Sequence, residues 1–198
     1  MKLRTIMLAT LCLATTMAYA QATPANTAAS GGEIMLKITK LDFLRSINPL
    51  LLTKQQLLQL LGTMDKCKAK EMEIRALDVV ELKKLEAEID KNLTAAIEKA
   101  DLPNRDFQNK IVAVQEALLI RRRIATNEMV DMLWETVKKN LNDGQIAAMG
   151  GLFNPKDIDP KLDPAKMTAE DKARIYIKYI FLDGLAYELM NQLYKHAK

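Results

Sequence analysis

Apolar residues recur at helical spacings through the first half of the chain. Between Thr53 and Ala100 there is no proline and a single glycine, and the apolar positions lie three or four residues apart: Leu57, Leu61, Met64, Val79, Leu82, Leu85, Ile89, Leu93 and Ile97. This spacing predicts an amphipathic helix. One uninterrupted helix of this length would measure about 70 Å, so we expect a break near Asp78.

A second helical pattern runs from Arg105 to Asn140. Its apolar stripe contains Ile111, Val114, Leu118, Ala125, Met129, Met132, Leu133 and Val137. The residues between the two patterns, 101–104, include Pro103 and predict a stop and a turn. Two long amphipathic segments joined by a tight turn predict an antiparallel helical hairpin over residues 53–140.

The flanking segments predict shorter elements. Residues 33–48 are rich in apolar side chains without a clear period, so a short helix and an extended strap both remain open. A short helix is expected from Asn142 to about Gly151, and the proline-containing stretch 153–166 predicts a linker. A C-terminal helix over residues 168–197 carries one apolar stripe: Ile175, Tyr179, Leu182, Ala186, Leu189 and Leu193. The fold class predicted is all-α, with one helical domain at 33–198.

The N-terminus has the layout of a cleavable signal peptide. Lys2 and Arg4 precede an apolar run from residue 6 to residue 17, and the small-residue triplet 18–20 ends it. This layout predicts cleavage before Gln21, export to the periplasm, and a flexible leader at 21–32. Lipidation of Cys12 is disfavoured because Leu11 occupies the place of a small residue. No later segment offers about 20 uninterrupted apolar residues, so a soluble mature protein without a membrane span is expected.

Charge argues against nucleic acid as a dedicated partner. The chain has 29 Lys and Arg and 25 Asp and Glu, and removal of Lys2 and Arg4 leaves 27 basic residues against 25 acidic ones. A net charge of about +2 lacks the basic excess typical of nucleic-acid binding.

The first long helical pattern opens with a strong start signal. Thr53 is a good N-cap, Gln56 three residues later completes a capping box, and Leu52 before the cap can act as a hydrophobic staple. On capping alone, Thr53→Ala is expected to cost about 1 kcal/mol of stability and Gln56→Ala less.

The predicted short helix has a start signal of the same form. Asn142 is the expected cap, Gln145 completes the capping box, and Leu141 stands at the staple position.

Leu52, Thr53 and Gln56 resemble the LTxxQ signature of the periplasmic Spy/CpxP-like family, and the second site retains Leu141 and Gln145 of that pattern. The resemblance covers residues 53–151. It implies a bent all-helical hairpin, an ATP-independent chaperone or stress-adaptor role in the bacterial envelope, and unfolded or envelope proteins as partners. It also implies a homodimer.

The residue inventory disfavours an enzyme. His196 is the only histidine, and there is no glycine-rich phosphate loop. One histidine and one mature cysteine, Cys67, cannot together build a transition-metal site, so no metal or other cofactor is expected. Asp157, Asp159 and Asp163 are interpreted as a solvated acidic linker. Cys67 is interpreted as a buried apolar residue in preference to a thiol for intermolecular pairing.

Arg121, Arg122 and Arg123 form the strongest local charge feature. One interpretation is an exposed helix face whose arginines pair with nearby acids. The other is a basic, half-apolar surface that attracts acidic unfolded clients, which makes the three arginines candidate client-binding residues. Two functional hypotheses follow: a chaperone-like or stress-adaptor protein, or a structural or regulatory helical partner that docks one envelope protein.

Overall fold

The computed structural model describes residues 31–152, 154–158 and 160–197, with only the backbone of Asp157. Every regular element in these ranges is helical, which confirms the all-α class. The elements are α1 Gly31–Ile47, η1 Asn48–Leu50, α2 Lys54–Lys83, α3 Glu86–Lys99, α4 Arg105–Asn140, α5 Asp143–Gly151, η2 Pro155–Asp157, α6 Ala169–Tyr176, the π-helix η3 Ile177–Phe181 and α7 Gly184–His196.

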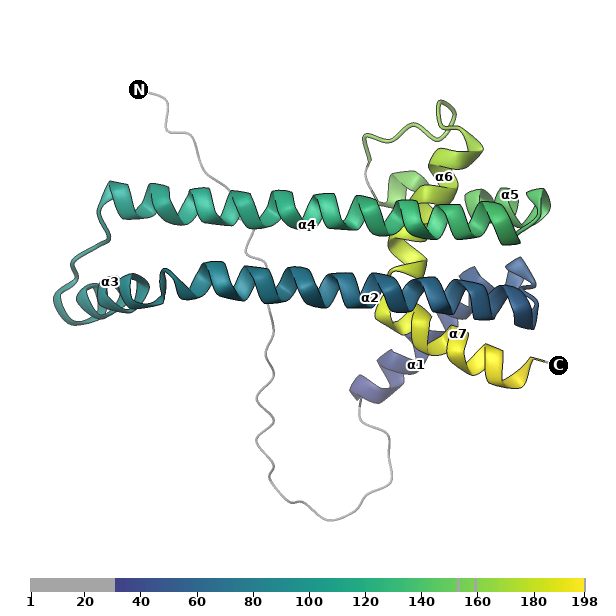
Figure 1. Cartoon of the computed structure of the whole chain (residues 1–198), viewed down its shortest axis with the longest axis horizontal. Coiled ribbons are helices and arrows are strands. Elements are labelled where there is room, and N and C mark those ends of the chain that lie inside the picture. Colours follow the sequence, from purple (N-terminus) through teal and green to yellow (C-terminus); the bar gives the residue numbers. More distant parts are fainter. Residues whose placement is uncertain (1–30, 153, 159, 198) are drawn as a thin grey trace, which may run out of the picture.

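The two longest helices, α2 and α4, lie side by side and antiparallel along the length of the molecule (Figure 1). Ala100 adopts the left-handed conformation that ends α3, and the side chain of Asn104 accepts a hydrogen bond from the backbone amide of Phe107 at the start of α4. The predicted turn at 101–104 therefore occurs, and α4 has the expected bounds.

The break in the first long segment lies later than expected. Helix α2 continues past Asp78 to Lys83, and the chain then turns at Lys84 and Leu85 before α3. The amides of Lys84 and Leu85 bond to carbonyls three residues back, at 3.3 and 3.0 Å, which tightens the last turn. The helix passes through Asp78, whose carboxylate is ion-paired with α4.

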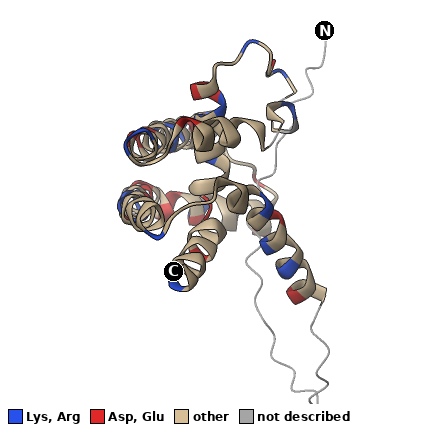
Figure 2. Cartoon of the chain, turned by 90° about the vertical axis from the view of Figure 1, so that its right-hand side faces the viewer, with Lys and Arg blue, Asp and Glu red and all other residues tan. Residues whose placement is uncertain are grey.

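The remaining helices gather around one end of the long pair, where α2 begins and α4 ends. We call this the proximal end. Viewed along the hairpin axis, α1, α6 and α7 lie to one side of α2 and α4, and no described helix lies on the opposite side (Figure 2). The largest fully buried side chains are Tyr176, Phe181, Ile47, Leu50, Leu57, Leu60, Leu133, Met149, Ile177, Met190 and Val137. All of them lie at the proximal end.

The C-terminal segment is not the single helix that its apolar stripe predicts. Helix α6 begins after the Thr168 cap, passes into the π-helix η3 and ends in a bend at Leu182 and Asp183. The Asp183 carboxylate accepts the Leu185 amide at 2.8 Å and starts α7 as a new helix. Helix α6 packs on α5 whereas α7 packs on α2, and Tyr179 of the predicted stripe is exposed. The expectation of one continuous helix was wrong because Asp183 and Gly184 are a helix start.

Residues 33–47 form part of helix α1. Of the two alternatives that the sequence left open for this segment, the structure has the helix and not the extended strap. Gly31 and Gly32 belong to this helix, so the predicted leader overlaps α1 by two residues. The predicted signal peptide at 1–20, its cleavage site and Cys12 lie outside the described residues. None of the described helices combines the length and apolar content that a bilayer crossing requires.

Candidate binding surface

Both predicted capping boxes are complete. The Thr53 hydroxyl accepts the Gln56 amide at 3.2 Å, and the Gln56 side-chain oxygen accepts the Thr53 amide at 2.9 Å. Asn142 and Gln145 repeat the arrangement at 2.9 and 3.0 Å. The start signals of α2 and α5 are therefore confirmed as helix caps.

The structure also brings the two boxes together. The Gln56 and Gln145 amides bond to each other reciprocally, at 3.0 and 3.1 Å. Each Nε2 group has a second acceptor at 2.8 Å, the carbonyl of Asn140 for Gln56 and that of Leu50 for Gln145. We call this pair the glutamine clamp.

The glutamine clamp satisfies each side chain completely. An amide has two N–H donors and an oxygen that accepts two hydrogen bonds. With the capping bonds included, Gln56 and Gln145 use all of these sites. Because the clamp joins η1, the end of α4 and the starts of α2 and α5, it fixes the proximal end.

The arginine cluster is largely occupied by a buried acid. Asp78 of α2 has a side chain only 3% exposed, and its two oxygens accept Nη1 of Arg121 at 2.9 Å and Nε of Arg122 at 2.7 Å. Arg123 is exposed and has no ion pair within the described part of the chain. Of the three candidate client-binding residues, two thus connect α4 to α2. The sequence analysis did not recognise Asp78 as the partner of these arginines, although an acid between the apolar residues Leu77 and Val79 indicates a possible buried ion pair.

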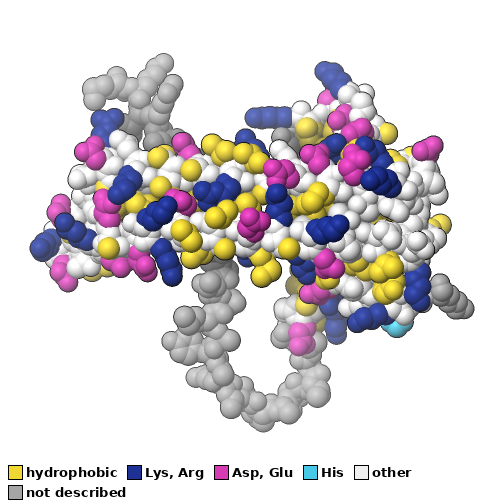
Figure 3. Space-filling model, viewed as in Figure 1, with side chains coloured by type: hydrophobic (Ala, Val, Ile, Leu, Met, Phe, Trp, Pro, Cys, Tyr) yellow, Lys and Arg dark blue, Asp and Glu magenta, His cyan; other side chains and the backbone are white. Residues whose placement is uncertain are grey.

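The far part of the hairpin exposes many apolar side chains. We define the distal hairpin as residues 72–124, which comprise the end of α2, α3, the turn and the first part of α4. Its exposed large apolar residues are Met72, Leu77, Val79, Val80, Leu82, Leu93, Ile97, Leu102, Val112, Leu119, Ile120 and Ile124. By contrast, its buried apolar residues are Leu85 and Leu118. Apolar side chains lie between charged ones along the two long helices in Figure 3.

A shallow groove between α2 and α4 concentrates part of this surface. Its volume is about 450 Å³, and Ile74, Ile120 and Ile124 line it. An ion pair between Lys70 and Glu128 lies at its edge. We call it the distal groove. The periodicity of the sequence predicted that apolar residues share a helix face, but not that no described element covers this part of the face.

The remaining candidate residues form no reactive or metal-binding arrangement within the described part of the chain. Cys67 is buried, its Sγ lies 3.8 Å from the carbonyl oxygen of Met129, and burial raises the pKa of its thiol to about 11. His196 is exposed at the last turn of α7. Asp163 caps a turn at Ala165, while Asp159 and the Asp157 side chain lie outside the described residues. The described residues contain no group of three His, Cys, Asp or Glu side chains suited to a metal ion.

No protein-family model matches the chain, and no significant similarity to a curated protein or to a solved structure was found. The resemblance to the LTxxQ family therefore depends on the motif residues alone.

Proposed function

We propose that this chain is a non-enzymatic periplasmic protein of the chaperone-like or stress-adaptor type, which binds apolar segments of unfolded proteins on the distal hairpin. The observation that carries the proposal is the run of twelve exposed large apolar side chains between residues 72 and 124. The predicted signal peptide and the two capping motifs support the envelope location and the family type.

Exposed apolar surface of this extent favours a binding role. Contiguous apolar patches on soluble proteins usually mark interaction sites, and Ile74, Ile120 and Ile124 form such a patch in the distal groove. Around the distal hairpin, ion pairs such as Arg75 with Glu71 and Lys84 with Glu81 separate the apolar side chains. Dispersed apolar contacts between charges suit weak, reversible binding of many sequences.

The distal hairpin also has the stiffness that a binding platform needs. The ion pairs of Asp78 with Arg121 and Arg122 tie α2 to α4 midway along the pair. Further out, Lys110 of α4 pairs with Glu88 of α3. A surface held in place loses less conformational entropy when a client binds.

The proposal is tested with polar replacements on α4. Leu119, Ile120 and Ile124 are each more than half exposed, so a variant with all three changed to Gln should keep its helicity. We expect it to lose most of its suppression of aggregation for two unrelated unfolded clients, measured by light scattering. The matched control changes Ile34, Ile38 and Leu41, exposed residues of α1, to Gln and should retain protection. Equal protection by both variants would contradict the assignment of the surface.

The alternative function is docking of a single envelope protein. The distal groove favours it, because a groove of fixed shape between Ile74, Ile120 and Ile124 can select one partner. In that case the unmodified protein would protect neither unrelated client. The homodimer implied by the resemblance is tested by sedimentation equilibrium of the mature chain.

A further inference from the structure

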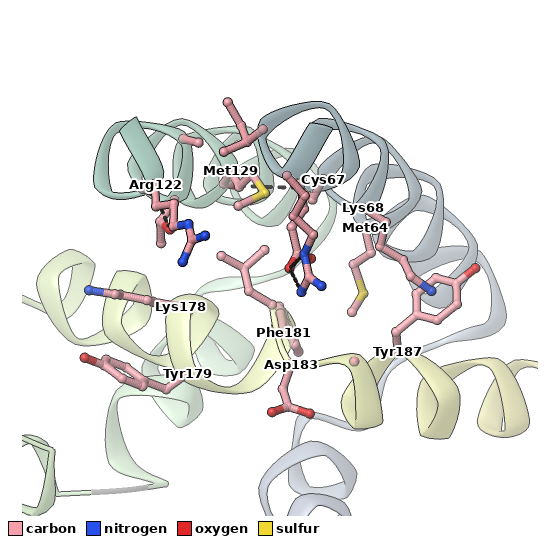
Figure 4. Close-up of a pocket in the computed structure, with 17 residues that line it drawn as sticks. Met64, Cys67, Lys68, Arg122, Met129, Lys178, Tyr179, Phe181, Asp183 and Tyr187 are labelled. Atoms are coloured by element: carbon pink, nitrogen blue, oxygen red, sulfur yellow. Dashed lines mark hydrogen bonds and ion pairs between the residues drawn. The ribbon is translucent and has the colours of Figure 1, made fainter. Parts of the chain in front are cut away.

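A second cavity shares the lining residues Ile74 and Ala125 with the distal groove. Its volume is about 570 Å³, and it lies between α2, α4 and the bend that joins η3 to α7. Figure 4 shows its lining residues. We call it the bend cavity. A volume of this size is typical of small-molecule sites.

The floor of the bend cavity is apolar and rich in sulfur. Met64 and Cys67 from α2, Met129 from α4 and Phe181 from η3 are all buried lining residues. The Cys67 thiol is neutral at neutral pH, and burial raises its pKa further. Thioether and aromatic groups adapt to a flexible apolar ligand. The floor therefore suits an alkyl chain.

The acidic groups at the rim are already engaged. Arg75 donates two hydrogen bonds to the Glu71 carboxylate. The carboxylate of Asp183 caps the Leu185 amide, and in Figure 4 it lies on the far side of Phe181 from Met129. Glu71 is therefore neutralised by Arg75, whereas Asp183 keeps its charge, and four lining cations, Lys68, Arg75, Arg122 and Lys178, outnumber these two carboxylates.

The cations at the rim are less fully used. Lys68 lies over the ring of Tyr187 and Lys178 beside that of Tyr179, and neither forms an ion pair with a described carboxylate. Arg122 bonds Asp78 through Nε, and its guanidinium points toward the cavity in Figure 4. The uncompensated charge at the rim is therefore positive.

The π-helix η3 adds an independent indication of a ligand site. It supplies Lys178, Tyr179 and Phe181 to the cavity. Single-turn π-helices are rare and frequently occur at functional sites, because the wider turn re-aims neighbouring side chains.

We propose that the bend cavity binds a single-chain anionic amphiphile. The alkyl chain lies against Met64, Met129 and Phe181, and the carboxylate or phosphate group lies at the rim cations. None of the client-surface residues Leu119, Ile120 and Ile124 lines the bend cavity, so either proposal can fail alone.

The first test compares decanoate with decanol on the full mature chain by titration calorimetry. The carboxylate adds charge-assisted hydrogen bonds at the rim, so we expect one saturable decanoate site and at least about tenfold weaker binding of decanol. Equal affinities for the two ligands would overturn the anionic headgroup, and the absence of a saturable decanoate site would overturn the cavity itself.

Methionine methyl NMR locates the bound ligand. Decanoate should shift the signals of Met64 and Met129, which line the cavity, and leave that of Met72 on the distal hairpin unchanged. A shift confined to Met72 would place the bound decanoate on the client surface and contradict the proposal.

Two variants of equal charge test the rim. Changing Lys68 and Lys178 to Gln should weaken decanoate binding about tenfold. The control changes Lys66 and Lys195, which are exposed and do not line the cavity, and should bind within about twofold of the unmodified chain. Equal weakening of decanoate binding in both variants would show that the loss arises from net charge, and it would overturn the rim assignment.

A filling variant tests the cavity without removing charge. Thr126 is a half-buried lining residue, and Thr126→Phe should abolish the Met64 and Met129 shifts while circular dichroism stays unchanged. Persistent shifts would contradict the proposal, and the comparison of decanoate with decanol decides it if the variant fails to fold.

Phosphatidylglycerol vesicles distinguish a free amphiphile from a bilayer headgroup. Sedimentation with vesicles that is lost in the Lys68 and Lys178 variant would overturn the single-chain ligand.

Discussion

The proximal end and the distal hairpin are built from the same two helices, yet they are stabilised in different ways. At the proximal end, α2 packs against α7 and α4 packs against α6 and η3, and residues such as Leu60 and Leu133 are fully buried. In the distal hairpin no described element covers the pair in this way, and its most deeply buried residue is Asp78. One half is held by apolar packing and the other depends on an ion pair.

The difference shows how one helical pattern can serve two purposes. Leu133 and Leu119 both lie on α4, but the first is fully buried and the second is 63% exposed. A third layer of helices turns an apolar face into a core, whereas the same kind of face without that layer becomes a surface for other molecules. The following experiments test this contrast.

The largest expected effect comes from truncating the two leucines of α4. Leu133→Ala should lower the free energy of unfolding by about 3 kcal/mol, because it leaves a cavity in a packed core. Leu119→Ala should change it by less than about 0.5 kcal/mol. Urea denaturation followed by circular dichroism measures both. Similar losses would show that the distal hairpin is packed as tightly as the proximal end.

Removing the two arginines that bind Asp78 should destabilise the distal hairpin. Arg121→Ser with Arg122→Ser leaves a buried carboxylate without partners, at a cost of about 3 kcal/mol. Arg123→Ser is the matched control and should cost less than about 0.5 kcal/mol. Hydrogen exchange should accelerate first between residues 72 and 124. Uniform acceleration along the chain would contradict an independent, locally stabilised hairpin.

The glutamine clamp should show a coupling that capping alone does not predict. Gln56→Ala removes contacts to Asn140 and Gln145 as well as the cap, so it should cost about 2 kcal/mol, against about 1 kcal/mol for Thr53→Ala. This order is the reverse of the one expected from the capping box. A double-mutant cycle between Gln56 and Gln145 should give a coupling of about 1 kcal/mol. Additive losses would show that the two boxes act separately.

The smallest effect concerns Cys67 at alkaline pH. The pKa of its thiol rises from 9.0 to about 11 on folding, so the unfolded chain ionises first as the pH increases. The stability associated with the neutral thiol is fully present below pH 9 and is lost as the pH rises toward 11, by up to about 1.4 kcal/mol per pH unit. Denaturation midpoints at pH 8, 9 and 10 measure this slope. Cys67→Ala should flatten it, and an unchanged slope would assign the effect to other groups.

Local patterns in the sequence were sufficient for most of the secondary structure. The bounds of α4, the turn before it and both capping boxes follow from interactions within four residues, which a sequence displays directly. The Asp183 cap was equally local and was overlooked because the apolar stripe continues across it. The helix break at Lys84 was misplaced because a length argument does not locate a break, and no proline or glycine marks this position.

By itself, the sequence determined that the chain is all-α, the bounds of α4 and the starts of α2 and α5, because side-chain periodicity and capping act over one or two turns. Only the tertiary structure decided which apolar faces are covered. The pairing of Gln56 with Gln145 and of Asp78 with two arginines joins residues 89, 43 and 44 positions apart. The bend cavity exists because η3 and α7 return to α2 and α4. Such contacts depend on how whole helices are placed against one another, and helical periodicity carries no information about that placement.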